Sequence, residues 1–326
     1  MGKELEDFGR KSKGQFYLNL ALSSADPSKQ FEKPKKPFIV THIPRTAGTT
    51  LDSIIRAVSG SSGAVFRRAL GSIYGQYLGS DKGDAVESIL EKEKPDDKIH
   101  YMIGHIPFGI HRRLGLEDAT YTVVLRDPIL RLFSQIKLGY PTQAAFGAKE
   151  INAVIDGNKI VDNSQVRIIA GCFDPEEKCD DKMLRTAIDN LKTRYTYVGF
   201  QEHFQRLLHQ VIEGEQWPSI LYLRKHQSPY TEIELTELSS KKLAPFLHLD
   251  NLLYEEAKNT FGFSKMGTQA PVPVNTQTIQ TESQADIVFN VLPHQLMGFE
   301  AGTLPHRLIQ GAMERLEKNG LPVYRV

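Results

Sequence analysis

Two short segments of the chain combine arginines, hydroxyl side chains and small residues in the pattern of an anion site. The first, HIPRTAGTTL, covers residues 42–51 and comes directly after the apolar run PFIVT. A turn of small residues between a strand and a helix points backbone N–H groups and the positive end of the helix dipole at one place. The segment predicts a phosphate-binding turn, although it lacks the GxxxxGK spacing of a Walker A loop. The residues expected to form this site are Arg45, Thr46, Gly48, Thr49 and Thr50.

The second segment, LRDPILRLFS, covers residues 125–134. Arg126 is expected to end a strand, Pro128 suits the first turn of the following helix, and Ser134 falls about two turns further on. Arg126 and Ser134 therefore predict a second anion site, while an ion pair between Arg126 and Asp127 is the structural alternative. Two anion sites at the ends of two strands suit a nucleoside that is phosphorylated at both ends.

Alternating strand and helix patterns would place both segments on one sheet. Runs rich in β-formers predict strands at residues 37–42, 99–103, 121–125, 195–200 and 220–223. Apolar residues at helical spacing predict helices around residues 51–58, 130–136, 184–191 and 204–211. This order favours an α/β fold with a mainly parallel sheet, in which ligands bind where strands give way to helices.

Composition divides the chain into four parts. Residues 1–35 are polar and end in a Lys/Pro cluster, which predicts an N-terminal arm. Residues 36–265 carry the strand and helix patterns of the main domain, and residues 266–285, rich in Thr, Gln, Pro and Ser, predict a linker. Residues 286–326 are expected to form a small helical appendage, whose apolar face at residues 308–316 would dock on the main domain or on a partner.

The overall composition restricts partners and location. The 40 Lys and Arg residues against 39 Asp and Glu residues give a formal charge of +1, so the global charge does not indicate nucleic acid as a partner. No run approaches about 18 apolar residues, and the first ten residues lack the apolar core of a signal peptide. We therefore expect no membrane span and a cytoplasmic location. Cys172 and Cys179 are expected to be thiols, with a disulfide across this short loop as the alternative.

The two anion segments together resemble the nucleotide-binding motifs of sulfotransferases that use 3′-phosphoadenosine 5′-phosphosulfate (PAPS). HIPRTAGTT is similar to their 5′-phosphosulfate loop, and RDPILRLFS is similar to their 3′-phosphate motif. The branch that this chain resembles contains the heparan sulfate 2-O- and 6-O-sulfotransferases and many bacterial relatives. The resemblance covers roughly residues 36–265, and three weaker stretches share it: GHIPFGIH, DNSQVRIIAG and LDNLLYEEAKNTF.

This resemblance implies a three-layer sandwich with a P-loop-kinase-like sheet and with PAPS laid across its carboxyl edge. Arg45, Thr46, Gly48, Thr49 and Thr50 would hold the sulfate-bearing 5′ end, and Arg126 and Ser134 would hold the 3′-phosphate. Arg224 and Lys225 fall where relatives place a basic loop over the nucleotide, and a solvated surface loop is the plain alternative. Likewise, the polar residues of the DNSQVR stretch either line the acceptor site or form a polar helix face: Asn163, Gln165 and Arg167.

The implied reaction transfers the sulfuryl group of PAPS to a hydroxyl of a carbohydrate or a small metabolite, and it needs no metal. The attacking hydroxyl must lose its proton, and His105 is the candidate general base because a histidine side chain titrates near neutral pH. A structural role for His105 is the alternative, and His111 is the second candidate base. Relatives usually have Lys at the position of Arg45, and Arg can stabilise a leaving phosphate by charge but cannot protonate it.

Two other functions fit the same residues. A phosphoryl-transfer kinase on a related fold would need the Walker lysine and a Mg²⁺ motif, which the sequence lacks. A non-catalytic module that binds nucleotide or glycan would explain Arg45 as the mark of lost chemistry. Affinity for adenosine 3′,5′-bisphosphate relative to ATP distinguishes the kinase, and turnover of PAPS distinguishes the non-catalytic module.

Overall fold

The centre of the molecule is a parallel sheet. The computed structural model describes residues 14–21, 33–61, 66–72, 99–138, 152–153, 155–156, 160–174, 176–217, 220–227, 237–262, 274–275, 289–291 and 323–325. The sheet has five strands in the order β3 (Phe66–Ser72), β4 (Tyr101–His105), β2 (Phe38–Thr41), β5 (Thr120–Leu125) and β6 (Tyr195–Phe200). Every pairing in it is parallel. The α/β class with a mainly parallel sheet is therefore confirmed.

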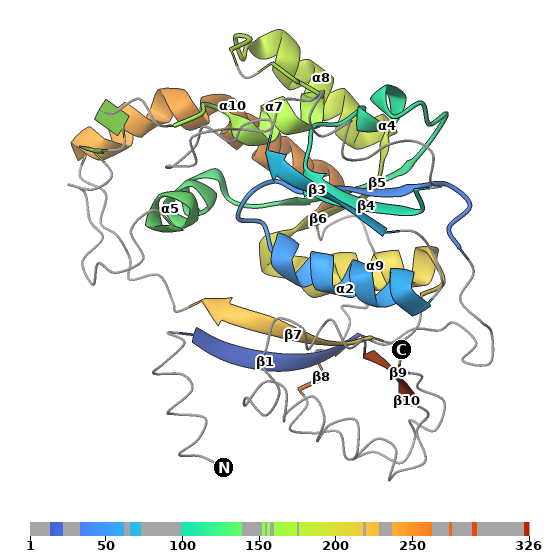
Figure 1. Cartoon of the computed structure of the whole chain (residues 1–326). Coiled ribbons are helices and arrows are strands. Elements are labelled where there is room, and N and C mark those ends of the chain that lie inside the picture. Colours follow the sequence, from blue (N-terminus) through green and yellow to red (C-terminus); the bar gives the residue numbers. More distant parts are fainter. Residues whose placement is uncertain are drawn as a thin grey trace.

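Helices cover both faces of this sheet (Figure 1). On one face lie α2 (Gly48–Ser61) and α9 (Phe204–Gly214), and over the other lie α7 (Ser164–Ala170), α8 (Asp181–Thr193) and α10 (Glu237–Phe261). Three further helical elements are α4 (Ile110–Arg113), α5 (Pro128–Leu138) and the short turn η2 (Gln201–His203), and residues 152–153 and 155–156 are helical as well. The predicted helices at residues 51–58, 130–136, 184–191 and 204–211 correspond to α2, α5, α8 and α9.

Alternation along the strands builds a separate hydrophobic core on each face. Phe38 and Val40 of β2 belong to the core that packs against α2 and α9, where Leu51 and Leu207 meet them. Ile39, between them in sequence, belongs to the core beneath α7, α8 and α10. Successive side chains of a strand point to opposite faces, so four consecutive buried residues can serve two cores.

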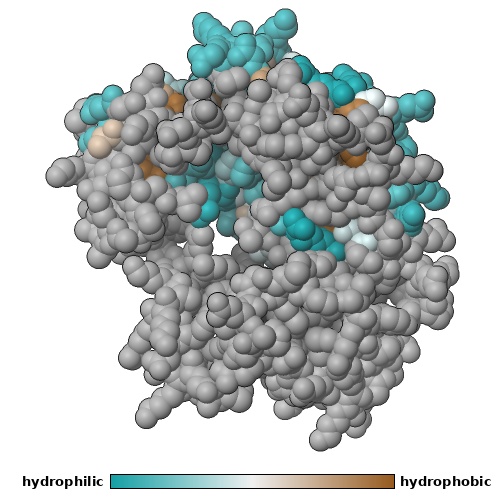
Figure 2. Space-filling model, in the orientation of Figure 1, coloured by the Kyte–Doolittle hydropathy of each residue, from teal (hydrophilic) through white to brown (hydrophobic). Residues whose placement is uncertain are grey.

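α8 illustrates how the outer helices meet the solvent. Its buried residues recur at helical spacing, whereas Lys182, Arg185 and Asp189 are exposed. Figure 2 shows a mainly hydrophilic surface at the top of the molecule, where Figure 1 places this helix. The Asp180 carboxylate caps the helix by accepting from the Met183 N–H at 3.0 Å. None of the described helices combines the length and the apolar character needed to cross a membrane.

A second, antiparallel sheet lies beyond α2 and α9, away from the parallel sheet (Figure 1). It contains β1 (Gly14–Ala21), β7 (Ile220–Gln227) and β8 (Val274–Asn275). β1 falls in the predicted arm and β8 in the predicted linker. In the predicted appendage, β9 (Phe289–Val291) pairs with β10 (Val323–Arg325), whereas the helix predicted around residues 308–316 lies outside the described residues.

The prediction of a basic loop at Arg224 and Lys225 is wrong for the backbone. Both residues continue β7, where Arg224 pairs with Tyr17 and Lys225 pairs with Phe16 of β1. β1 provides the hydrogen-bonding partner, and the alternating sequence FYLNL that builds it stands in an otherwise polar segment. β7 is therefore a strand, as predicted, but it lies outside the parallel sheet. The fifth parallel strand is β3, which the sequence pattern did not predict.

Candidate functional site

The loop between β2 and α2 forms the first half of the site. Arg45 and Ala47 both have positive φ, 73° and 65°, which costs energy in residues other than glycine and often marks functional turns. Thr46 is buried, and its hydroxyl donates to the Ile43 carbonyl at 2.7 Å, so this side chain fixes the turn from inside. The loop ends where α2 begins at Gly48. The positive end of the α2 dipole is therefore at this turn.

The junction between β5 and α5 forms the second half. β5 ends at Leu125 and α5 begins at Pro128, as the sequence predicted. The Asp127 carboxylate caps α5 by accepting from the Leu130 N–H at 2.9 Å. Asp127 therefore has a structural role of its own as a helix cap. The ion pair with Arg126, which was the structural alternative, is not needed to explain this residue.

The two halves are in direct contact. Arg45 Nε donates to Ser134 Oγ at 2.9 Å, and Arg126 Nη1 donates to the Arg45 carbonyl oxygen, also at 2.9 Å. These contacts join residues that are 89 and 81 positions apart in the sequence. They form because β2 and β5 are neighbouring parallel strands whose carboxyl ends meet at one edge of the sheet. We call Arg45, Arg126 and Ser134 the arginine cluster.

The arginine cluster has the electrostatics of an anion site. Arg126 is only 6% exposed and Ser134 only 2%, and Arg45 is half-buried. Arg45 and Arg126 bring two positive charges to a poorly hydrated corner, and a bound dianion would offset their mutual repulsion. Ser134 accepts a hydrogen bond from Arg45 and keeps its own O–H as a donor. The residues predicted to form two anion sites are therefore in contact at one edge of the sheet.

Gln165 of α7 supports Arg126 from behind. Its side-chain oxygen accepts from the Arg126 N–H at 3.2 Å, and its amide nitrogen donates to the Arg126 carbonyl at 2.9 Å. Gln165 is completely buried, Asn163 is 3% exposed, and Arg167 is ion-paired with Asp162 at 2.6 Å. The three polar residues of the DNSQVR stretch thus make internal contacts. Because all three are buried, they do not form an exposed polar helix face. No described contact places them along an acceptor surface.

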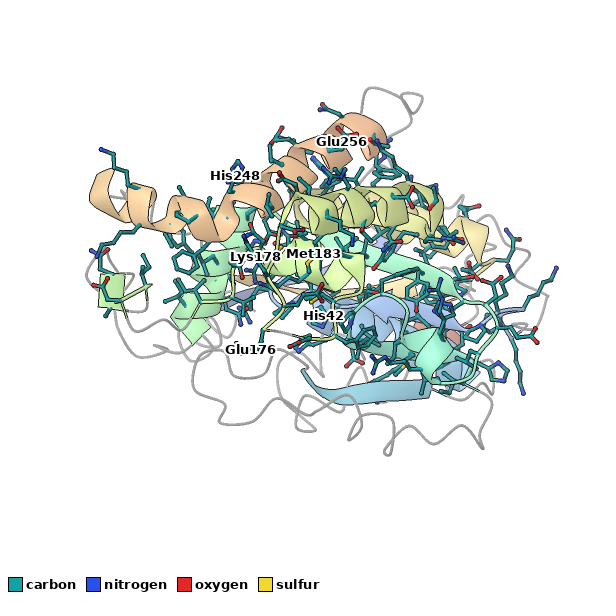
Figure 3. The ribbon with its side chains drawn as sticks, turned by 90° about the horizontal axis from the view of Figure 1, so that it is seen from above. His42, Glu176, Lys178, Met183, His248 and Glu256 are labelled. Carbon is teal, nitrogen blue, oxygen red and sulfur yellow. The ribbon has the colours of Figure 1, made fainter. Side chains whose placement is uncertain are left out.

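His105 lies at the carboxyl end of β4 and is half-buried. Its ring faces that of His42, with the ring centroids 4.6 Å apart and the planes tilted by 48°. His42, labelled in Figure 3, follows β2, and its backbone N–H donates to the Gly104 carbonyl at 2.8 Å. A Cβ atom on Gly48 would come within 1.7 Å of His42 Nε2, so only glycine lets this imidazole lie against the start of α2. His42, for which no role was predicted, therefore links His105 to the anion loop.

His111 is placed differently. Its Nδ1 lies 2.7 Å from the Tyr121 hydroxyl, which also accepts from the backbone N–H of His111 at 3.3 Å and of Gly109 at 3.2 Å. Burial lowers the pKa of His111, and the charge of Arg112 lowers it further. Tyr121 precedes Arg126 by five positions along β5, a separation of about 16 Å in a strand. In this structure His111 anchors α4 to β5 and lies away from the arginine cluster.

Other predicted site residues are described only in part. Thr50 donates its backbone N–H to the Ala47 carbonyl at 3.1 Å, which closes the first turn of α2. The backbones of Thr49, Arg224 and Lys225 lie in α2 and β7, while their side chains lie outside the described part of the chain. Their nucleotide contacts stay predictions.

The two cysteines are free in the structure. Cys172 is buried and donates its S–H to the Asp174 carbonyl at 2.9 Å. Burial raises the pKa of the Cys179 thiol to about 12, which keeps it protonated at neutral pH. Both cysteines lie in or next to the turn between α7 and α8 and have no contact with the arginine cluster among the described interactions.

The fold and the arginine cluster define a class of protein. It is an α/β protein with two arginines and a serine joined by hydrogen bonds at the carboxyl edge of a parallel sheet. Comparison with models of known protein families gives no match, and none of the curated proteins searched matches the chain. The function is therefore argued from the site itself.

Proposed function

We propose that this chain is a sulfotransferase that moves the sulfuryl group of PAPS onto a hydroxyl acceptor. The contact between the two motif segments is the observation that carries the proposal: Arg45 reaches Ser134, and Arg126 reaches the backbone of Arg45. PAPS carries negative charge on both its 3′ and 5′ sides. A protein that binds both sides of one nucleoside needs its two anion motifs side by side, as these are.

The topology of the sheet gives further support. β2 bears the anion loop, and its neighbours β4 and β5 lie on opposite sides of it. The chain thus changes direction across the sheet at the carboxyl end of β2, which is where ligands of open α/β sheets bind. This arrangement fits the proposed three-layer, P-loop-kinase-like sulfotransferase fold, in which the nucleotide lies across this edge.

Each residue of the site has a role in the proposal. Arg126 and Ser134 bind the 3′-phosphate, while the turn at Arg45 to Thr50 and the start of α2 bind the 5′-phosphosulfate. Arg45 Nε contacts Ser134 in the structure, so its guanidinium can reach the 3′ subsite as well as the loop that carries it. Arg45 therefore joins the two subsites, which the forked donors of Arg allow and a Lys ammonium would do less well.

The proposed reaction is an in-line displacement at sulfur. The acceptor oxygen forms a bond to sulfur as its proton passes to His105, and the bond from sulfur to the phosphate oxygen breaks with its electron pair. The leaving group is adenosine 3′,5′-bisphosphate, whose new charge is stabilised by Arg45 and by the amino end of α2. Acceptors of this chemistry are carbohydrate or small-metabolite hydroxyls. None of these steps uses a metal ion.

Calorimetric titration tests the proposal against a kinase. The wild-type chain is expected to bind adenosine 3′,5′-bisphosphate more tightly than ATP with Mg²⁺, because the arginine cluster serves the 3′-phosphate that ATP lacks. Tighter binding of ATP with Mg²⁺ would overturn the proposal. Release of adenosine 3′,5′-bisphosphate from PAPS in the presence of alcohols, followed by chromatography, then tests catalysis. A chain that binds the bisphosphate but releases none from PAPS would be the non-catalytic module.

A further inference from the structure

A buried polar network joins α7 and α10 directly behind the arginine cluster. The Asp250 carboxylate accepts from the backbone N–H of Gln165 at 3.2 Å and of Val166 at 2.9 Å, at the amino end of α7. In return, the Asn163 side-chain oxygen accepts from the backbone N–H of Leu249 at 2.8 Å and of Asp250 at 3.1 Å, within α10. Each helix thus supplies the side chain that caps a turn of the other.

The backbone of Asn163 also takes part in this exchange. Its N–H donates to the Phe246 carbonyl at 2.7 Å, the group that would accept from the Asp250 N–H in a regular α-helix. One turn later the N–H groups of Leu249 and Asp250 bond to Asn163. Asn163 itself has a φ of 47°, a left-handed conformation that asparagine tolerates better than most residues.

The charge in this network is balanced inside the protein. Asp250 is completely buried, and Arg131 of α5 is 4% exposed. Burial raises the pKa of Asp250 to about 6, and the charge of Arg131 opposes that rise. Arg131 Nε has no hydrogen-bond partner among the described residues, so Arg131 acts on Asp250 mainly through its charge. The network therefore includes one side chain from the same helix as Ser134.

Gln165 carries the network to the site. Its backbone N–H is held by Asp250, and its side chain pairs with both the N–H and the carbonyl of Arg126. Because the Arg126 backbone is fixed in this way, its guanidinium is presented to the Arg45 carbonyl and to the space beside Ser134. A change at Gln165 would move a cation of the cluster without removing any group that contacts the ligand.

We propose that Gln165, held by Asp250, is the positioning residue that fixes Arg126 for a nucleotide 3′-phosphate. This inference rests on the proposed function. It assigns part of the free energy of binding a 3′-phosphate to residues that do not themselves contact the nucleotide. A positioning role and a merely structural role have different consequences. Loosening of the whole fold weakens every nucleotide alike, whereas displacement of Arg126 weakens only ligands that carry a 3′-phosphate.

The test measures the affinity of the full chain for adenosine 3′,5′-bisphosphate and for 5′-AMP in calorimetric titrations. Gln165→Met keeps the volume and removes both hydrogen bonds to Arg126, and it is expected to lower the preference for the bisphosphate by about tenfold or more. Its affinity for 5′-AMP should change less than about twofold. Gln165→Leu removes the same two hydrogen bonds with an apolar side chain of different shape and should lower the preference equally, which keeps the test available if Gln165→Met does not fold.

Asn190→Leu is the matched control. Asn190 is also a buried amide that holds α7, since its side chain donates to the Ile169 carbonyl at 2.9 Å, but it lies at the other end of the helix from Gln165. Its loss should lower the melting temperature and leave the preference unchanged. An unchanged preference in Gln165→Met, or an equal loss in Asn190→Leu, would overturn the positioning role while the wild-type preference keeps the proposed function. A wild-type chain without any preference would overturn both.

Discussion

Arg45 is the residue on which the account of this site depends most. It has a positive φ, its carbonyl accepts from Arg126, and its side chain reaches Ser134. The backbone of one arginine is thus held by a second arginine, and both guanidinium groups are directed at the same edge of the sheet. Removal of Arg45 would weaken the loop and the charge together, so a conservative variant is needed to separate the two effects.

Arg45→Ala and Arg45→Lys provide that separation. If Arg45 stabilises charge mainly on the departing phosphate, Arg45→Ala should lower kcat by more than it weakens nucleotide binding. Arg45→Lys keeps the charge and should retain much of the rate. Single-turnover release of adenosine 3′,5′-bisphosphate and calorimetric titration measure the two quantities. Weaker nucleotide binding with an unchanged kcat in Arg45→Ala would assign the residue to ground-state binding alone.

His105 is predicted to remove the proton from the acceptor. His105→Ala should lower kcat by roughly 10²–10⁴-fold and leave nucleotide affinity nearly unchanged, because a general base acts only in the chemical step. The fall in rate on the acid side of the pH profile should disappear with it. His111→Gln serves as the comparison, since His111 packs on Tyr121 away from the cluster. Wild-type turnover by His105→Ala with a true acceptor would exclude His105 as the base.

Single residues of the site could be predicted to different degrees. Arg45 and Arg126 stood out because each follows a strand, and Ser134 stood out because it falls about two turns further along the chain from Arg126. Gln165 and His42 could not be assigned, since their contacts depend on backbone positions that only the fold brings together. The Thr46 hydroxyl donates to the Ile43 carbonyl, a contact that the sequence did not indicate, and its contact with an anion stays a prediction.

Among the elements, α7 and α10 are coupled most closely to the site. Their exchange of caps buries Asp250 completely, and a buried carboxylate favours its protonated form unless its charge is fully balanced. Burial raises the pKa of Asp250 from 3.8 to about 6 despite the charge of Arg131. The packing of these two helices therefore depends on pH in a range where most surface carboxylates have already ionised.

Asp250→Asn tests this dependence. Because the pKa of Asp250 is raised in the folded state, its contribution to stability is complete below the ordinary pKa and is lost as the pH rises through about 6. Asn does not titrate, so between about pH 4 and pH 6 the free energy of unfolding should fall less in the variant than in the wild type, by roughly 2 kcal/mol. Urea titrations at several pH values measure both slopes. Parallel slopes for the wild type and the variant would contradict the raised pKa.

Elements could be predicted where one periodicity dominates. β2, β5 and β6 are short buried runs, and α8 and α9 are strongly amphipathic, so each was found close to its actual bounds. β1 and β3 were missed because polar neighbours mask their alternation and their partners are distant in sequence. β7 was predicted as a strand, but its place in the fold was not. It pairs with β1 and not with the parallel sheet, and this pairing depends on long-range contacts that the local sequence does not determine.

At the scale of the whole molecule, the site lies at the carboxyl end of β2, the central strand of the sheet, whose side chains contribute to both hydrophobic cores. β2 occupies the middle of the sheet, with helices packed on both faces, so the loop that follows it has rigid support. β5 lies beside it and brings Arg126 to the same edge. This arrangement brings the two sequence motifs together, and the central claim of the proposed function is that they form one anion site.

The most direct measurement is calorimetric titration of the wild-type chain and of Arg126→Ala with adenosine 3′,5′-bisphosphate and with 5′-AMP. The wild type is predicted to bind the bisphosphate far more tightly than 5′-AMP, and Arg126→Ala is predicted to weaken bisphosphate binding by about 10- to 150-fold, as expected for the loss of one charge-assisted contact. Affinity for 5′-AMP should change little in the variant. Equal affinity of the wild type for the two nucleotides would contradict the account, because the arginine cluster would then not recognise a 3′-phosphate.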